Sequence, residues 1–148
     1  MAYRGRFQPV NTHKYMGDIS KIEYRSSWEY KLMHWLDMND HVAKWGSETV
    51  VIPYYSNADC KNRRYFMDFV VHYIDGSKFL YEVKPEKETK PPRKVGRKKE
   101  SVYLAECYTF SVNKDKWIHA IQYAKSNGYI FKILTEHNMK SHFGINLI

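Results

Sequence analysis

Residues 65–84 read YFMDFVVHYIDGSKFLYEVK, and this stretch decides the fold because it predicts a β-hairpin. Its apolar residues form two runs, Tyr65–Ile74 and Lys78–Lys84, which the polar segment Asp75-Gly76-Ser77 separates. An Asp-Gly pair between two such runs is typical of a hairpin turn. We therefore expect two antiparallel strands here and interpret the rest of the chain around them.

Three charged residues of the hairpin, Asp68, Glu82 and Lys84, can form one polar patch. Val83 separates Glu82 from Lys84, so these two side chains point to the same face. A two-residue turn at Asp75-Gly76 would pair Asp68 with Val83 and place it on the other face. A three-residue loop, Asp75-Gly76-Ser77, or a single bulge would place Asp68 with the other two, opposite Lys84.

Such a patch has the composition of a metal-dependent hydrolytic site. The carboxylates of Asp68 and Glu82 are hard oxygen ligands that suit Mg²⁺ or Mn²⁺. A bound cation of this kind lowers the pKa of a coordinated water, and Lys84 would orient that water or stabilise developing charge. The alternative interpretation is a solvated cross-strand salt bridge, which contributes at most about 1 kcal/mol.

Residues 24–40 predict a helix that Ser26 or Ser27 caps, and this helix supplies a fourth candidate, Glu29. One turn into the helix, Glu29 is placed to reach the patch. Ser26 to Glu29 also matches a capping box, in which the glutamate binds back to the cap. The two roles are compatible. The residues at helical spacing are Trp28, Leu32, Trp35 and Leu36.

The segments before the hairpin give weaker patterns. Residues 1–24 are polar and basic, and we expect an extended arm without regular structure. Trp45-Gly46-Ser47 is interpreted as the end of a connection, and Thr49–Ile52 as a strand that Pro53 limits. Ser56–Asn62 is expected to be a polar loop.

After the hairpin, the pattern predicts a second helix and a final strand. Residues 102–111 are apolar without a clear period, so either a helix or a strand is possible. Asn113 is expected to cap a helix that ends at Gly128, followed by a strand at Tyr129–Leu134 and a short helix at Glu136–His142. One face of the second helix would carry Trp117, Ala120, Ile121 and Ala124.

The order is therefore helix, three strands, helix, strand. It predicts one α/β domain over residues 1–148, with a mixed central sheet flanked by helices. The last strand returns through a helix, which favours parallel pairing.

Residues 85–100 predict a flexible, Pro-rich basic loop beside the patch. The whole chain has a net charge of +8, which favours a polyanionic partner. Cations of the loop would bind DNA phosphates without reading sequence, or they form an ordinary solvated loop. The candidates are Arg93, Lys94, Arg97, Lys98 and Lys99.

Several function classes are not expected from this sequence. Cys60 and Cys107 lack metal-knuckle spacing and are expected to be free thiols, and the seven histidines form no zinc motif. There is no glycine-rich phosphate loop, so we expect no nucleotide cofactor. No apolar run is typical of a signal peptide or a membrane span, so we expect an intracellular protein without membrane contact.

Asp68 and Glu82-x-Lys84, after a helix with Glu29, resemble the PD-(D/E)xK restriction-endonuclease-like superfamily, whose core order is αβββαβ. Almost the whole chain also resembles the head completion nucleases of tailed phages, and the nuclease domain of the cutting subunit of heteromeric transposases looks like a more distant relative. The segments that carry the closer resemblance are Arg4–Phe7, Asn11, Lys14–Asp18, Tyr24–Glu29, Trp35–Asp37, Ser47-Glu48, Ile52–Tyr54, Arg64–Phe69, Glu82–Pro85, Asn113–Trp117 and Leu134–Glu136.

The resemblance implies a Mg²⁺-dependent deoxyribonuclease, with Mn²⁺ as a substitute, that acts after DNA packaging and before head–tail joining. Asp68, Glu82 and Glu29 would hold the metal and Lys84 would serve the water, while Lys116 is expected to approach the phosphate. Met67 replaces the proline that usually precedes the strand aspartate, and that proline is not a ligand.

The implied partners are DNA and head or neck proteins, in the host cytoplasm during assembly or on the virion. Two alternatives remain: a non-catalytic DNA-binding head protein, and a transposase- or recombination-type nuclease that needs a partner.

Overall fold

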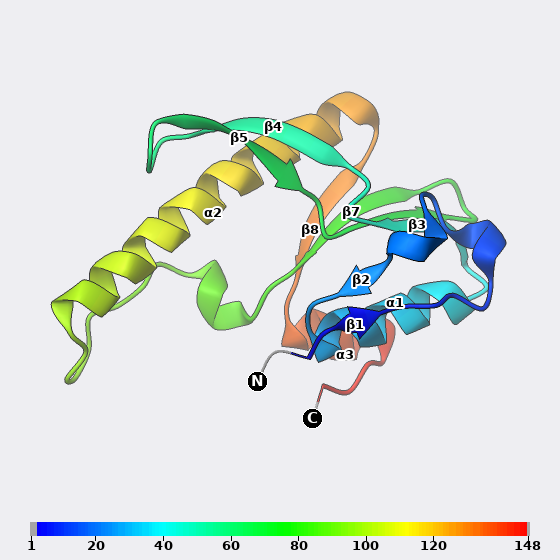
Figure 1. Ribbon diagram of the computed structural model, residues 1–148, viewed down its shortest axis with the longest axis horizontal. Helices are drawn as coiled ribbons and strands as arrows, with labels where there is room; N and C mark the ends of the chain where they lie inside the picture. Colours follow the sequence, from blue (N-terminus) through cyan, green and yellow to red (C-terminus); the bar gives the residue numbers. More distant parts are fainter. Residues whose placement is uncertain (1–2, 148) are drawn as a thin grey trace.

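A four-stranded mixed sheet forms the centre of the computed structural model, which describes residues 3–147 (Figure 1). The strand order is β3 (Val42–Ser47), β6 (Phe69–Tyr73), β7 (Lys78–Val83) and β8 (Ile130–Leu134). Strand β6 is antiparallel to both β3 and β7, and β8 is parallel to β7. The predicted parallel return is confirmed.

Helices cover both faces of this sheet (Figure 1). On one side lie α1 (Ser27–Met38) and α3 (Glu136–Phe143), and on the other lies α2 (Glu100–Asn127). A two-stranded ribbon of β4 (Val51–Ser56) and β5 (Lys61–Phe66) packs beside α2. Along the chain, α1, β3, β6, β7, α2 and β8 give the predicted αβββαβ order.

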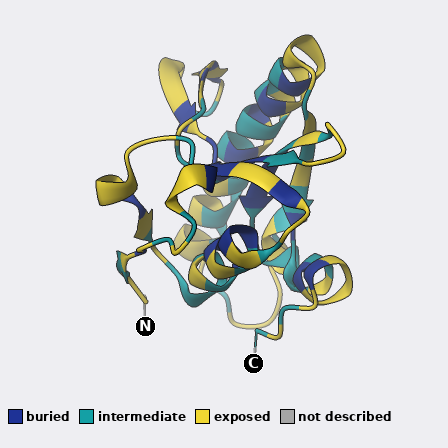
Figure 2. Ribbon diagram, turned by 90° about the vertical axis from the view of Figure 1, so that its right-hand side faces the viewer, coloured by how far each residue is buried: buried dark blue, intermediate teal, exposed yellow. Residues whose placement is uncertain are grey.

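Alternation along β7 separates two apolar cores. Tyr81 packs with α1 and α3, whereas Leu80 packs with α2 and the ribbon. Glu82 has the same parity as Leu80 and therefore points toward α2. Figure 2 shows the buried residues gathered on the sheet and on the inner sides of the helices.

The first core strand along the chain is not the one that the sequence predicted. The segment Thr49–Ile52 contributes to β4, which continues through Pro53 and pairs only with β5. Proline is tolerated there because, among residues 3–147, no strand pairs with the other edge of β4. The core strand is β3, which contains Trp45 and was interpreted as part of a connection.

The predicted strand Tyr65–Ile74 is in fact two strands in different sheets. The chain leaves the ribbon after Phe66 and enters the central sheet at Phe69, so only Met67 and Asp68 lie between them. The predicted loop Ser56–Asn62 is correspondingly shorter, because β5 already begins at Lys61.

The N-terminal segment is ordered, contrary to the prediction of an arm without regular structure. Strands β1 (Gly5–Arg6) and β2 (Glu23–Tyr24) pair, with short 3-10 helices η1 (Thr12–Lys14) and η2 (Ile19–Lys21) between them. The buried carboxylate of Asp37 on α1 accepts the main-chain N–H groups of Val10 and Asn11 at 2.8 and 3.2 Å. Met1 and Ala2 lie outside the described residues.

Helix α2 is twice as long as the sequence indicated. It begins at Glu100, so residues 102–111 are helical and Asn113 is a buried mid-helix residue rather than a cap. All buried residues of α2 lie from Asn113 onward, because its first half projects beyond the sheet and has no continuous apolar stripe. Ala120 and Ala124 are buried as expected, whereas Ile121 is 56% exposed.

The C-terminal elements agree with the prediction to within one residue. Gly128 ends α2 with a φ of 77°, in the left-handed region that glycine tolerates. Within residues 3–147, no helix combines the length and apolarity that a membrane span requires.

Candidate active site

The hairpin loop decides which side chains share a face. Tyr73 N–H donates to Ser77 O at 2.9 Å, so the loop has three residues, Ile74-Asp75-Gly76. The predicted loop was one residue later, and the true register places Asp68 across from Glu82 rather than across from Lys84. A shift of two positions keeps the face unchanged. Asp68, Glu82 and Lys84 therefore lie on the side of the sheet that faces α2.

Asp68 lies immediately before β6, where its carboxylate is held by the neighbouring strand. Oδ2 accepts the main-chain N–H of Val83 at 2.9 Å. Burial, followed by the negative charge of Glu82, raises the pKa of Asp68 to about 8. The charge of Glu29 acts in the same direction, while the Val83 hydrogen bond and Lys84 act against it. The electrostatics thus place two carboxylates and the lysine around Asp68.

Glu82 is buried, and α2 supplies its polar contact. The indole N–H of Trp117 donates to Oε2 of Glu82. Tyr65 of the ribbon completes the surroundings: burial and then the negative charge of Glu82 raise the pKa of its phenol. Its buried hydroxyl has no hydrogen-bond partner of normal geometry among the described residues. Neither aromatic residue was singled out from the sequence as part of the site.

Glu29 takes part in the helix start and also lies near the patch. Its N–H donates to Ser26 Oγ at 3.1 Å, as in the predicted capping box. Its carboxylate, however, accepts the N–H of Arg25 at 3.2 Å, one residue before the cap. The side chain is half-buried, and burial is the main cause that raises its pKa. The helix start therefore fixes Glu29 at the end of α1 nearest to Asp68.

Glu48 is a charged neighbour of the site that the sequence analysis did not identify. It adopts a left-handed backbone with φ of 56°, and its N–H is shared by the main-chain oxygens of Met67 and Asp68 at 3.1 and 3.2 Å. Its Oε1 pairs with Arg25 at 3.2 Å. Its negative charge helps to raise the pKa of Glu29. The segment Ser47-Glu48 belongs to the family resemblance, but no sequence pattern indicates that Glu48 lies beside the site.

Two lysines approach the patch from different elements. Lys84 follows β7, and its main-chain N–H donates to Leu134 O at 3.0 Å, which fixes the chain as it leaves the sheet. Lys116 of α2 lies with its Nζ 5.4 Å from the ring centroid of Tyr65. Tyr65 thus neighbours both residues, with Lys116 over its ring and Glu82 near its phenol group.

The three predicted metal-binding carboxylates are not tightly clustered. Across residues 3–147, one trio of Asp, Glu, His or Cys has ligand atoms all within 4.8 Å of one another: Glu86, Glu136 and His137. Its groups already bind each other, since Glu136 accepts the N–H of Glu86 and His137 contacts the carboxylate of Glu86. Glu29, Asp68 and Glu82 do not meet this spacing as a set.

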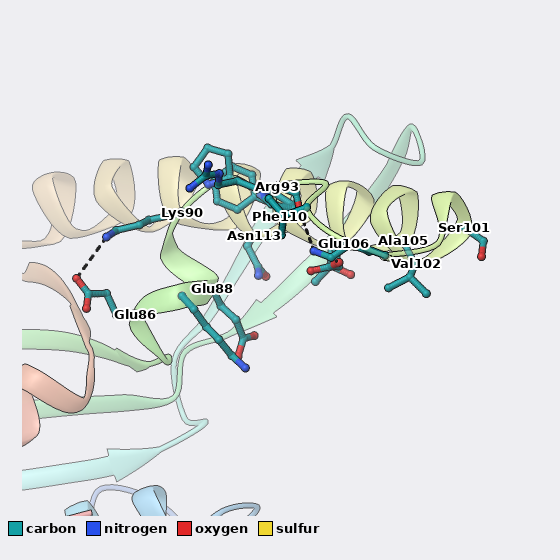
Figure 3. A pocket seen from close by; sticks show the side chains of 16 residues that line it. Glu86, Glu88, Lys90, Arg93, Ser101, Val102, Ala105, Glu106, Phe110 and Asn113 are labelled. Atoms are coloured by element: carbon teal, nitrogen blue, oxygen red, sulfur yellow. Dashed lines mark hydrogen bonds and ion pairs between the residues drawn. The ribbon is translucent and has the colours of Figure 1, made fainter.

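The basic loop borders a groove of about 1040 Å³ against the projecting half of α2 (Figure 3). Within the loop, η3 (Glu86–Thr89) forms one short turn. Two of the five predicted DNA-binding cations are paired, Lys94 with Glu100 and Lys98 with Glu106. Arg93, Arg97 and Lys99 are exposed. Phe110 and Asn113 line the groove a few residues before Trp117 along α2.

Comparison with known proteins adds two findings. Residues 39–136 match the family model described as TnsA-like endonuclease N terminal. The chain is also 46% identical over 144 residues to the head completion nuclease of Enterobacteria phage T4, a match that covers 95% of this chain and 96% of that protein. The family-model match contains β3 to β8, and therefore the whole hairpin with Asp68, Glu82 and Lys84.

Proposed function

Because the chain belongs to the family of phage head completion nucleases and contains a TnsA-like endonuclease N-terminal domain, we propose that it hydrolyses DNA phosphodiesters with Mg²⁺ or Mn²⁺. The observation that carries this proposal is the placement of Asp68 and Glu82 across adjacent strands, with Lys84 on the same face.

The donors of the site fit such a cation. Within the described part of the chain, neither Asp68 nor Glu82 forms an ion pair. A bound metal cation would therefore neutralise the repulsion between their carboxylates. Mg²⁺ needs only one or two protein carboxylates, because waters and phosphate oxygens complete its shell. Asp68 and Glu82 would hold it, with Glu29 further out. When bound, it would acidify a coordinated water and neutralise charge on the phosphate.

The remaining charged residues would orient the reactants. Lys84 would direct its ammonium group at the attacking water or at the charge that develops on the phosphate. Glu29 would hold a water on the side of α1, and Lys116 would contact a phosphate oxygen beside Tyr65. Arg93, Arg97 and Lys99 would bind the DNA backbone, with smaller contributions from Lys94 and Lys98, whose charges are already paired.

The name of the T4 relative supports a role in head completion. We place the action of this chain in the host cytoplasm, after packaging and before the tail is joined, with head or neck proteins as partners. The match to the TnsA-like model supports a second candidate, a nuclease that cuts only with a partner protein.

Cleavage of plasmid and linear DNA tests the proposal directly. Wild-type protein should cut with Mg²⁺ or Mn²⁺ and not with EDTA, while folded Asp68→Ala and Lys84→Ala should be inactive. DNA binding without cleavage by the wild type would favour a non-catalytic head protein, and cleavage that appears only when phage head extract is added would favour the partner-dependent nuclease. If both variants cleaved DNA as well as the wild type does, the active site would lie elsewhere.

A further inference from the structure

Glu82 is a buried carboxylate whose hydrogen bond comes from a neutral donor. It is 5% exposed, and no lysine or arginine of residues 3–147 forms an ion pair with it. Its partner is the indole N–H of Trp117, which reaches it from α2. The phenol of Tyr65 also lies within reach of Glu82, and it too is neutral. Neutral donors orient a buried carboxylate without cancelling its negative charge.

The Trp117 ring is half-buried and packs against an aromatic neighbour on its own helix, which restricts the direction of its N–H. Phe110, two turns earlier on α2, packs edge-to-face against it with ring centroids 6.2 Å apart and an interplanar angle of 82°. One turn later on the helix, Ala120 is fully buried against the ribbon and the sheet. An indole has one N–H and no acceptor, so it binds one oxygen of Glu82 and no more.

We propose that Trp117 is a positioning residue of the nuclease site: its N–H fixes Oε2 of Glu82, so that Oε1 is presented toward Asp68 and the cation. This inference rests on the proposed function. A lysine or arginine in the same place would neutralise the carboxylate and compete with the cation, whereas the indole orients it and leaves its charge available. Outer-shell donors of this kind typically change metal affinity or activity about 10–100-fold.

The atom to test is the indole nitrogen, because the ring also packs. Replacing Trp117 with 3-benzothienylalanine exchanges N–H for sulfur and keeps the shape, and Trp117→Phe serves as a genetically simple second variant. Trp45 is the matched control. It is fully buried, and its Nε1 has no hydrogen-bond partner among the described residues, so the same exchange there removes no such bond.

The first measurement is Mn²⁺ binding by calorimetry without DNA, with the signal of Asp68→Asn subtracted to remove other sites such as Glu86 and Glu136. We expect the Trp117 exchange to weaken Mn²⁺ binding about 10–100-fold and the Trp45 exchange to leave it unchanged. In cleavage, the Trp117 variant should need more metal for half-maximal rate. Unchanged Mn²⁺ affinity in the Trp117 variant would overturn the inference.

A spectroscopic readout separates orientation from packing. In a ¹H–¹⁵N spectrum, the indole signal that disappears in Trp117→Phe should move in Glu82→Gln and broaden first as Mn²⁺ is added. An indole signal that responds to neither would overturn the inference. If wild type and Asp68→Asn bind Mn²⁺ equally, the proposed metal site itself fails. If only the Trp117 exchange has no effect, the metal site stands and this inference alone fails.

Discussion

The carboxylate of Asp68 accepts the main-chain N–H of Val83, the residue that follows Glu82, at 2.9 Å. This bond ties the start of β6 to the end of β7 and keeps two acids together that repel each other. The repulsion is visible in the pKa of Asp68, which burial and Glu82 raise to about 8. The close placement of two carboxylates in the site therefore lowers the stability of the metal-free fold, and this loss of stability can be measured.

Replacing Asp68 with Asn should abolish cleavage and stabilise the metal-free protein. The amide oxygen still accepts the Val83 N–H, while the negative charge beside Glu82 is removed. For a chain of this length, each kcal/mol of relieved repulsion corresponds to about 2–4 °C in Tm. Thermal unfolding in EDTA at pH 8.5 measures the change. A lower Tm for Asp68→Asn than for wild type would contradict the repulsion.

The metal-free protein should become more stable as the pH falls through the range set by Asp68. Its pKa is about 8 when folded and 3.8 when unperturbed, so the folded state binds the proton more tightly. The destabilisation is complete above pH 8 and is relieved progressively between pH 8 and 4. Chemical unfolding in EDTA at pH 8.5, 7 and 6 should show this rise. In Asp68→Asn, the free energy of unfolding should change less with pH, and the difference from wild type gives the contribution of Asp68 separately from that of other titrating groups.

Asp115 should be needed to hold the ribbon on α2. It is buried on α2 and accepts the main-chain and side-chain N–H groups of Asn57 at 2.8 and 3.1 Å. Asp115→Ala leaves those donors unpaired, at a cost of about 1–3 kcal/mol in free energy of unfolding. The exposed neighbour Lys114 provides the control, since Lys114→Ala should be nearly neutral. Equal denaturation midpoints for the two variants would show that this contact does not hold the ribbon.

DNA binding should depend steeply on salt, and the unpaired cations should carry that dependence. Removing Arg93, Arg97 and Lys99 together should reduce the slope of log K against log salt by roughly 0.9 for each phosphate that is no longer neutralised. Removing Lys94 and Lys98 should reduce it less, because Glu100 and Glu106 already neutralise them. Fluorescence anisotropy on catalytically inactive protein measures both. A wild-type affinity that hardly changes with salt would exclude this loop as the DNA-binding surface.

The sequence predicted the order of the core but misidentified one of its strands. Thr49–Ile52 has an obvious β pattern and lies in the ribbon, whereas β3 reads VAKWGS and mixes small, charged and aromatic residues. Which segment enters the central sheet depends on long-range pairing with β6, and local pattern does not contain that information. Similarly, residues 102–111 show no clear apolar stripe because that half of α2 contains no fully buried residue, and its half-buried positions include Glu106.

For the candidate site, alternation placed Glu82 and Lys84 on one face, but the position of Asp68 depended on the length of the hairpin loop, which the sequence left open between two and three residues. The register was wrong by two residues because the turn begins at Ile74 rather than Asp75, and the parity was preserved. Trp117 and Tyr65 were missed as partners of Glu82. Their contacts come from α2 and the ribbon, which are remote in sequence, and an aromatic residue on a helix face gives no sign of which carboxylate it will meet.

The change of sheet between Phe66 and Phe69 has an evolutionary consequence. Two residues carry the chain from the ribbon to the central sheet, and Asp68 is one of them. An extra residue there would turn the acid toward α1, while the turn at residues 57–60 can absorb insertions without moving it. Across related chains, the number of residues between Tyr65 and Phe69 should therefore vary less than their identities, and length variation should accumulate at the tip of the ribbon.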